Sequence, residues 1–155
     1  MKIEWKSLLW NLALPLITGG LAALITQSSM EQFATFRQPP LSPPGWLFPI
    51  VWTILYTLMG ISSYLVSQSD SPLKNTALRI YGIQLGVNFF WPILFFRLNA
   101  FLGAFFWLLL LWILVLVMIV LFYKVKPIAG LLQIPYFLWI TFAAYLNLAI
   151  YFLNR

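Results

Sequence analysis

Two pairs of side chains are spaced so that they could line a ligand pocket. Trp52 is followed one helical turn later by Tyr56, and Trp139 is followed at the same interval by Ala143. Residues four positions apart share one face of an α-helix, so each pattern puts an indole beside an aromatic or a small side chain. Indoles stack on flat apolar ligands, but they are poor acids and bases. The two patterns therefore predict a lined pocket for a large, flat, mostly apolar ligand.

A third pattern carries amide groups within apolar sequence. Gln84 and Asn88 lie one turn apart, and Trp91 and Phe95 continue the same stripe. An amide in hydrocarbon must find hydrogen-bond partners, so this face is predicted to point into the protein. The spacing leaves open whether those partners are other helices or a ligand, and the same alternatives hold for Asn147.

Most catalytic chemistry lacks candidates in this sequence. Cysteine and histidine are both absent, which excludes thiolate nucleophiles, imidazole, histidine-ligated haem and ordinary zinc sites. The acidic residues Glu4, Glu31 and Asp70 are predicted to fall at or beyond helix ends, so paired-carboxylate catalysis and proton relays have no candidates. We expect no metal and no cofactor.

The composition places these patterns in a lipid bilayer. Hydrophobic residues make up 63% of the chain, charged residues only 8%, and the mean hydropathy is +0.93, which is incompatible with an aqueous surface all round. Segment 107–122 holds no polar side chain, whereas a membrane β-barrel requires polar and apolar residues in alternation. We predict a single domain over residues 1–155, an all-α integral membrane protein with a five-transmembrane-helix bundle. The predicted helices span approximately residues 7–26, 46–66, 76–96, 100–123 and 128–152.

The basic residues indicate membrane topology rather than nucleic-acid binding. The formal net charge is +6, but the basic side chains are scattered at helix ends instead of forming a patch. If the helices alternate, one side holds Lys2, Lys6, Lys74, Arg79, Lys124 and Lys126, and the other holds Arg37, Arg97 and Arg155. The positive-inside rule then predicts a cytoplasmic N-terminus and an external C-terminus, with no nucleic-acid partner.

The long connection at residues 27–45 is unlike an ordinary solvated loop. It contains Pro39-Pro40 and Pro43-Pro44, and proline fixes φ and donates no backbone hydrogen bond, so the segment is stiff. It also carries Phe33 and Phe36. These features favour a lid over the bundle, and the alternative is a linker on the membrane surface whose aromatic rings lie among the headgroups.

Three sequence blocks occur in order in the predicted second, third and fifth helices. The first runs from Pro43-Pro44 through Val51-Trp52-x-x-Leu55-Tyr56-x-x-Met59-Gly60. The second is Asn88-x-x-Trp91-Pro92-x-x-Phe95-Phe96. The third is Pro135-Tyr136-x-x-Trp139-x-x-x-Ala143-x-x-Leu146-Asn147. Together, over nearly the whole chain, they resemble the translocator protein family, also called the tryptophan-rich sensory proteins.

The resemblance implies a multi-pass protein of a bacterial plasma membrane, often a homodimer, that binds porphyrins such as protoporphyrin IX or similar flat apolar ligands beneath the first loop. It implies that the protein sequesters or senses porphyrin. The alternatives are light-dependent porphyrin degradation, with Trp52 and Trp139 as the catalytic pair, and transport of porphyrin or sterol-like ligands. The matching positions imply a pocket lined by Phe33, Pro43, Phe48, Trp52, Tyr56, Asn88, Trp91, Trp139, Ala143 and Leu146.

The first loop departs from the family pattern. Members commonly carry Lys-Pro-x-Trp before the double proline, whereas this chain has Gln38-Pro39-Pro40-Leu41. Loss of that lysine removes a partner for a ligand carboxylate. Arg37 is the only basic side chain nearby that could replace it.

Overall fold

The computed structural model describes residues 2–155, and all regular structure in that range is helical. The five long helices are α1 (Trp5–Thr26), α3 (Leu47–Ser67), α4 (Lys74–Pro92), α5 (Phe101–Val125) and α7 (Ile134–Asn154). The short helical segments are a 3₁₀ turn η1 (Gln27–Ser29), α2 (Met30–Ala34), a π-helical turn η2 (Ile93–Arg97) and α6 (Pro127–Leu131). The predicted five-helix architecture is confirmed.

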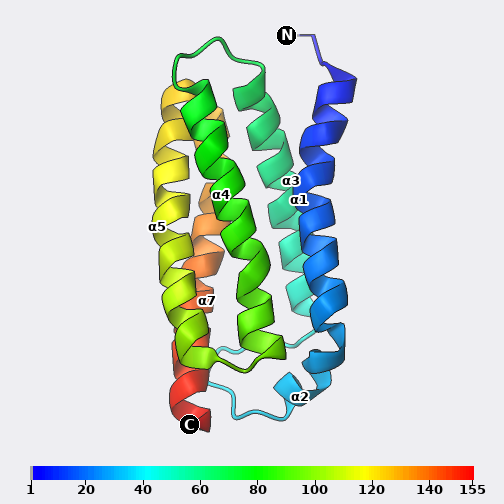
Figure 1. Ribbon diagram of the computed structural model, residues 1–155, viewed down its shortest axis with the longest axis vertical. Helices are drawn as coiled ribbons and strands as arrows, with labels where there is room; N and C mark the ends of the chain where they lie inside the picture. Colours follow the sequence, from blue (N-terminus) through cyan, green and yellow to red (C-terminus); the bar gives the residue numbers. More distant parts are fainter. Residues whose placement is uncertain (1) are drawn as a thin grey trace.

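The long helices run alternately up and down in one bundle, so the N- and C-termini lie at opposite ends (Figure 1). Residues 27–45, which carry η1 and α2, cross the end at which α7 finishes. We call this stretch the lid segment and that end of the bundle the lid end. The turn between α3 and α4, together with α6, lies at the opposite end.

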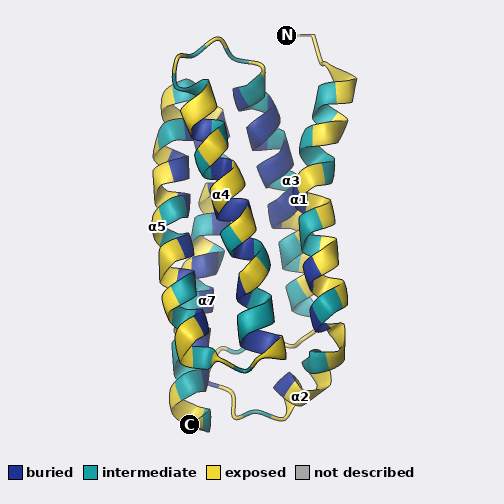
Figure 2. Ribbon diagram, viewed as in Figure 1, coloured by how far each residue is buried: buried dark blue, intermediate teal, exposed yellow. Residues whose placement is uncertain are grey.

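The exposed surface of the bundle is apolar, as a membrane protein requires. Exposed residues lie along the outer faces of the helices (Figure 2), and they include large side chains such as Trp10, Ile54 and Phe106. Four helical stretches are long and apolar enough to cross a membrane: Trp5–Ala34, Leu47–Ser67, Phe101–Val125 and Pro127–Asn154.

Helix α4 is the long helix that is not among these four stretches, and it is the most polar of the five long helices. Its amide side chains Gln84 and Asn88 are buried inside the bundle rather than turned to lipid. Its closest neighbour is α5, and it also packs against α1 and α3. Because its polar face is enclosed by protein, α4 can lie at membrane depth without exposing amides to hydrocarbon.

Two stretches differ from the sequence prediction. The helix expected at residues 128–152 is divided into α6 and α7, with a break at Leu132 and Gln133. Both pieces begin with a proline in the first turn, Pro127 and Pro135, where the missing N–H costs no helical hydrogen bond. The lid segment, predicted as a loop, is partly helical, since η1 and α2 follow α1 without a non-helical residue between them.

Helices α1 and α3 are fastened together in the half of the bundle farther from the lid. A Cβ atom on Gly60 would lie 2.8 Å from the carbonyl oxygen of Asn11, so only glycine permits this approach. The hydroxyl of Ser63 donates to Asn11 Oδ1 at 2.9 Å, and the backbone N–H of Glu4 donates to the hydroxyl of Tyr64 at 2.8 Å. Polar contacts and close backbone packing therefore close the α1–α3 seam at this end.

Candidate ligand-binding site

Trp52 lies at the centre of the aromatic interior at the lid end. Its ring stacks on Tyr56, one turn further along α3, with ring centroids 5.4 Å apart and planes 28° apart. The edge of Tyr136 from α7 approaches it at 6.1 Å and 68°. Both geometries are favourable for aromatic pairs, so one ring from α3 itself and one from α7 hold the indole in this orientation.

Hydrogen bonds join the phenols and amides beside Trp52 into one chain across three helices. The hydroxyl of Tyr56 donates to Asn88 Oδ1, Asn88 Nδ2 donates to the hydroxyl of Tyr136, and Tyr136 in turn donates to Gln84 Oε1. Each donor–acceptor distance is 2.7 Å. In this structure Asn88 bonds to side chains of α3 and α7, whereas Gln84 accepts a hydrogen bond from α7 and its buried Nε2 has no hydrogen-bond partner among residues 2–155.

Trp91 and Asn147 form a second polar link between helices. The indole N–H of Trp91 donates to Asn147 Oδ1 at 3.0 Å, and Asn147 Nδ2 donates to the backbone carbonyl of Phe101, at the start of α5, at 2.7 Å. This link ties α4, α7 and α5 together close to the lid. It also holds the Trp91 ring in place, where it stacks on Phe95.

A closed void of about 10 Å³ lies between α3, α4, α7 and the lid segment. Both indoles predicted to face one cavity, Trp52 and Trp139, line it. The other lining residues are Phe33, Phe48, Trp91, Phe95, Phe96, Ala143, Leu146, Asn147 and Ile150. This volume is about that of one water molecule, so the void in this conformation holds no larger ligand.

A larger cavity of about 330 Å³ lies on the other side of Trp52, between α1, α3 and α4. Four aromatic residues line both spaces and form the partition between them: Phe48, Trp52, Trp91 and Phe96. The remaining lining residues are Leu16, Gly19, Gly20, Ala22, Ala23, Thr26, Gln27, Met30, Pro49, Thr53, Tyr56, Asn88 and Pro92. A cavity of this volume is within the usual range for small-molecule sites, ~300–1,000 Å³.

The two walls of the larger cavity differ in side-chain size. The wall from α1 carries the small residues Gly19-Gly20 and Ala22-Ala23. Trp52 and Tyr56 of α3 also line the cavity, and the Tyr56 ring packs against α1 at Gly19. Beyond that contact, the small residues of α1 and the ring of Trp52 leave apolar space that suits a planar ligand. We call this cavity the slot.

The structure distributes the sequence-predicted pocket residues over both spaces. Five of them line the slot: Phe48, Trp52, Tyr56, Asn88 and Trp91. Seven line the closed void: Phe33, Phe48, Trp52, Trp91, Trp139, Ala143 and Leu146. Pro43 lines neither space.

Phe33 closes the lid end of the bundle. Its side chain is buried among four phenylalanines, with centroid distances of 5.0 Å to Phe96, 5.7 Å to Phe95, 6.2 Å to Phe48 and 6.3 Å to Phe36. It is therefore packed as part of the core in this structure. The ring lies between the closed void and the lid segment.

The α1 wall of the slot was missing from the predicted pocket. The consecutive small residues of α1 were a signal for it, because they permit close approach of either a helix or a flat ligand. The two adjacent glycines differ in this respect, because one packs against a helix and the other faces open space. The ring of Tyr56 occupies the place where a side chain on Gly19 would lie, whereas a Cβ on Gly20 would have no atom within 4 Å.

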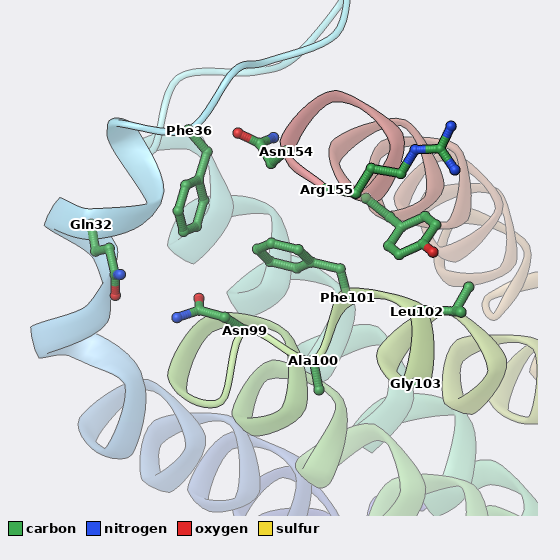
Figure 3. Close-up of a pocket in the computed structure, with 10 residues that line it drawn as sticks. Gln32, Phe36, Asn99, Ala100, Phe101, Leu102, Gly103, Asn154 and Arg155 are labelled. Atoms are coloured by element: carbon green, nitrogen blue, oxygen red, sulfur yellow. The ribbon is translucent and has the colours of Figure 1, made fainter.

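A third hollow, of about 560 Å³, lies at the lid end away from the Trp52 region (Figure 3). It is broad and open, and it is bounded by Gln32 and Phe36 of the lid segment, by residues 99–103 at the start of α5, and by Tyr151, Asn154 and Arg155 at the end of α7. The rings of Phe36 and Phe101 meet edge to face at 5.3 Å between centroids. None of the predicted pocket residues lines this hollow.

Comparison with known proteins decides the family of this five-helix fold. The model of the TspO/MBR family matches residues 11–153, which include α1 from Asn11 onward and the other four long helices almost completely. The chain belongs to the TspO/MBR family. It is consequently a membrane protein, and the family resemblance drawn from the three sequence blocks is confirmed.

Relatives of this TspO/MBR family member occur in bacteria, archaea and mammals. It is 37% identical to Protein CrtK of Rhodobacter capsulatus over 124 residues, 79% of this chain and 78% of the relative. It is 42% identical to the Tryptophan-rich protein TspO of Archaeoglobus fulgidus over 132 residues, 83% of each chain. The Translocator protein of Bos taurus is 31% identical over 151 residues, 95% of this chain and 89% of the relative.

Proposed function

We propose that this protein binds a porphyrin such as protoporphyrin IX, or a similar flat apolar ligand, and so sequesters or senses it within the membrane. The observation that carries the proposal is the slot, an apolar cavity of about 330 Å³ lined by small α1 residues such as the buried Ala22 and by the rings of Trp52 and Trp91. A planar ring system placed there would contact apolar surface on both faces. The family relationship supports the same class of ligand by resemblance.

The slot alone is smaller than a complete porphyrin with its substituents, so we propose that the ligand also displaces part of the partition. Phe48 and Trp52 are both half-buried and stand between the slot and the closed void. Rotation of either ring would join the two spaces and bring Trp139 and Ala143 into contact with the ligand. This arrangement would use all of the predicted pocket residues except Pro43.

Titration tests this proposal directly. Purified protein in detergent is titrated in darkness with protoporphyrin IX, and the porphyrin absorbance and the tryptophan fluorescence are recorded. We expect saturable quenching at one site per chain. Filling the slot from the α1 wall with Ala22→Phe should weaken binding at least tenfold, because Ala22 is buried in that wall. The proposal is overturned if the unsubstituted protein shows no saturable binding.

A second candidate function is light-dependent degradation of the bound porphyrin. The specific feature that favours it is the position of Trp52, which lines both spaces and stacks on Tyr56, with Trp139 across the closed void. Illumination of the saturated complex in the presence of oxygen tests this function. Loss of porphyrin absorbance faster than that of free porphyrin in the same detergent would support it.

We also propose that the N-terminus is cytoplasmic and that the lid segment lies outside. The charge asymmetry between the two ends of the helices supports this orientation. The chain contains no cysteine, so single-cysteine variants at the exposed residues Gln38 and Asp70 report the two sides. In intact cells a membrane-impermeant maleimide should label the variant at residue 38, and it should label the variant at residue 70 only after the cells are opened.

A further inference from the structure

The lid segment is fastened to α7 at several points. The side-chain amide of Asn154 makes two hydrogen bonds with the backbone of Arg37: the Arg37 N–H donates to Oδ1 at 2.9 Å, and Nδ2 donates to the Arg37 carbonyl at 3.0 Å. The hydroxyl of Tyr145 donates to the carbonyl of Pro40 at 2.8 Å. With Phe33 buried in its aromatic cage, the lid end is closed to a ligand as large as a porphyrin.

The slot has its own opening, and that opening is not beneath the lid. The lining residues that are exposed come only from α1, the η1 turn and α3: Leu16, Gly20, Ala23, Gln27, Pro49 and Thr53. Those contributed by α4 and η2 are buried, apart from the half-buried Pro92. The slot therefore opens sideways between α1 and α3. We call Gly20, Ala23, Pro49 and Thr53 the mouth.

The packing of α1 on α3 explains where the slot begins. Towards the N-terminal end the two helices touch at Gly60 and Asn11, and further along they touch again where the Tyr56 ring packs against Gly19. Past that contact the α1 face has small residues, Gly20 and Ala23, which cannot fill the space in front of Trp52. The mouth therefore lies on the lid side of the contact between Tyr56 and Gly19.

We infer that the ligand enters and leaves the slot sideways from the hydrocarbon phase, through the mouth between α1 and α3, while the lid remains closed. This inference rests on the proposed porphyrin-binding function and specifies the source of the ligand as molecules dissolved in the bilayer. The mouth lies on helices that span the membrane, and its rim offers no charged side chain that a membrane-dissolved ring would have to pass.

The rates of binding test the route, because a barrier on the route changes association and dissociation by the same factor and leaves the dissociation constant unchanged. Protein in phosphatidylcholine vesicles is mixed with vesicles that contain protoporphyrin IX, and tryptophan quenching is followed in time. Gly20→Phe narrows the mouth, and it should fold normally because a Cβ at Gly20 meets no atom within 4 Å. Ala23→Phe, also on the exposed rim, is a second test of the same kind.

We expect both rate constants to fall at least tenfold in Gly20→Phe and Ala23→Phe. Leu24→Phe is the matched control. Leu24 is exposed on α1 outside the slot, so this variant should leave both rates unchanged.

The lid is tested separately with the double variant Asn154→Leu, Tyr145→Phe, which removes three hydrogen bonds to the lid segment. Its association rate should remain within about twofold of the unsubstituted protein.

Two results would overturn the lateral route. One is unchanged rates in both mouth variants, and the other is association at least tenfold faster in the double variant Asn154→Leu, Tyr145→Phe. Either would indicate passage beneath the lid while leaving the proposed function standing. Failure of the unsubstituted protein to bind porphyrin at equilibrium is a different result, because it would remove the proposed function itself.

Discussion

Gly19 and Gly20 are neighbours in α1, but only one of them can accept a side chain. A Cβ on Gly19 would overlap the ring of Tyr56, whereas a Cβ on Gly20 would meet no atom within 4 Å. Tyr56 cannot easily withdraw, because its hydroxyl is bonded to Asn88 and its ring is stacked on Trp52. The two positions therefore form a natural matched pair.

We predict that Gly19→Ala destabilises the protein by about 1–3 kcal/mol, the usual cost of overfilling a packed interior. Gly20→Ala should be neutral or stabilising by up to ~1 kcal/mol, because alanine is the better helix former. Thermal unfolding of both variants in the same detergent measures the difference. Equal midpoints for the two proteins would show that Tyr56 does not pack against α1 as described.

The indoles at Trp52 and Trp139 allow binding to be separated from photochemistry. Phenylalanine retains an aromatic face, and the geometry of an aromatic pair contributes only ~0.5–1.5 kcal/mol beyond burial. Trp52→Phe or Trp139→Phe should therefore weaken porphyrin binding about tenfold or less. Phenylalanine is much harder to oxidise, so any photodegradation should fall far more than binding in the double variant. Equal degradation rates at saturating ligand would exclude an indole mechanism.

At the scale of elements, the lid segment is held by one buried aromatic ring as well as by its hydrogen bonds to α7. Phe33 is buried in contact with rings from the lid, α3 and η2, whereas most of its neighbours in sequence are exposed. Removing a buried phenylalanine ring typically costs about 3–5 kcal/mol. Since only the lid is held by this contact, that loss should appear as local opening rather than global unfolding.

We predict that Phe33→Ala accelerates cleavage by trypsin after Arg37 at least tenfold. Arg97 is an internal control, because it lies at the same end of the bundle on the η2 turn and donates to the carbonyl of Ile25. Cleavage after Arg97 should be unchanged. Mass spectrometry of the fragments distinguishes the two sites, and uniform acceleration at both would mean that the whole lid end had unfolded.

The elements differ in how far the sequence determines them. The predicted helix at 46–66 matches α3 at Leu47–Ser67, because its apolar run is bounded by a proline-rich segment and by a polar turn. The break at Leu132 and Gln133 was not predictable from hydropathy, since apolar residues continue through it on both sides.

The same limit applies to the site. The stripe of Trp52 and Tyr56 follows from helical periodicity, but its partners do not. Spacing along one helix cannot specify which face of α1 packs against the stripe of Trp52 and Tyr56. The slot between α1 and α3 could therefore be identified only from the structure. Nor could spacing show that Phe33 is packed into the core instead of lining an open pocket.

At the scale of the whole molecule, α4 presents a surface suited to a second copy of the chain. Gly82 and Gly86 are exposed one turn apart, and a Cβ at either position would meet no atom within 4 Å. Ile83 and Phe90 are exposed beside them. Small residues four positions apart permit close helix packing in membranes, so we propose that the homodimer implied by the family resemblance forms here.

We predict that the unsubstituted protein is a dimer and that Gly86→Leu is a monomer, because the larger side chain would separate the two helix backbones of the proposed interface. Gly103→Leu is the control, since Gly103 is also exposed and unobstructed but lies on α5. Light scattering coupled to size-exclusion chromatography gives the mass of the protein component. Dimers that persist in Gly86→Leu would place the interface elsewhere.

Because α1 is weakly buried, the concentration of ligand should affect how fast the protein is degraded. In its most apolar stretch only 11% of the residues are buried, against 33–44% in the other three spanning stretches, and the slot removes further contacts from its lid-side half. A ligand that fills the slot would supply the packing that α1 lacks. At a concentration 100 times its dissociation constant, such a ligand stabilises the folded state by about 2.7 kcal/mol.

Membrane proteases remove chains in proportion to how often they open, so empty copies would be degraded sooner than occupied ones. The number of molecules in the membrane would then follow the porphyrin concentration without any change in gene expression. A half-life that lengthens when porphyrin synthesis is raised, and that no longer does so in Ala22→Phe, would reveal this form of control.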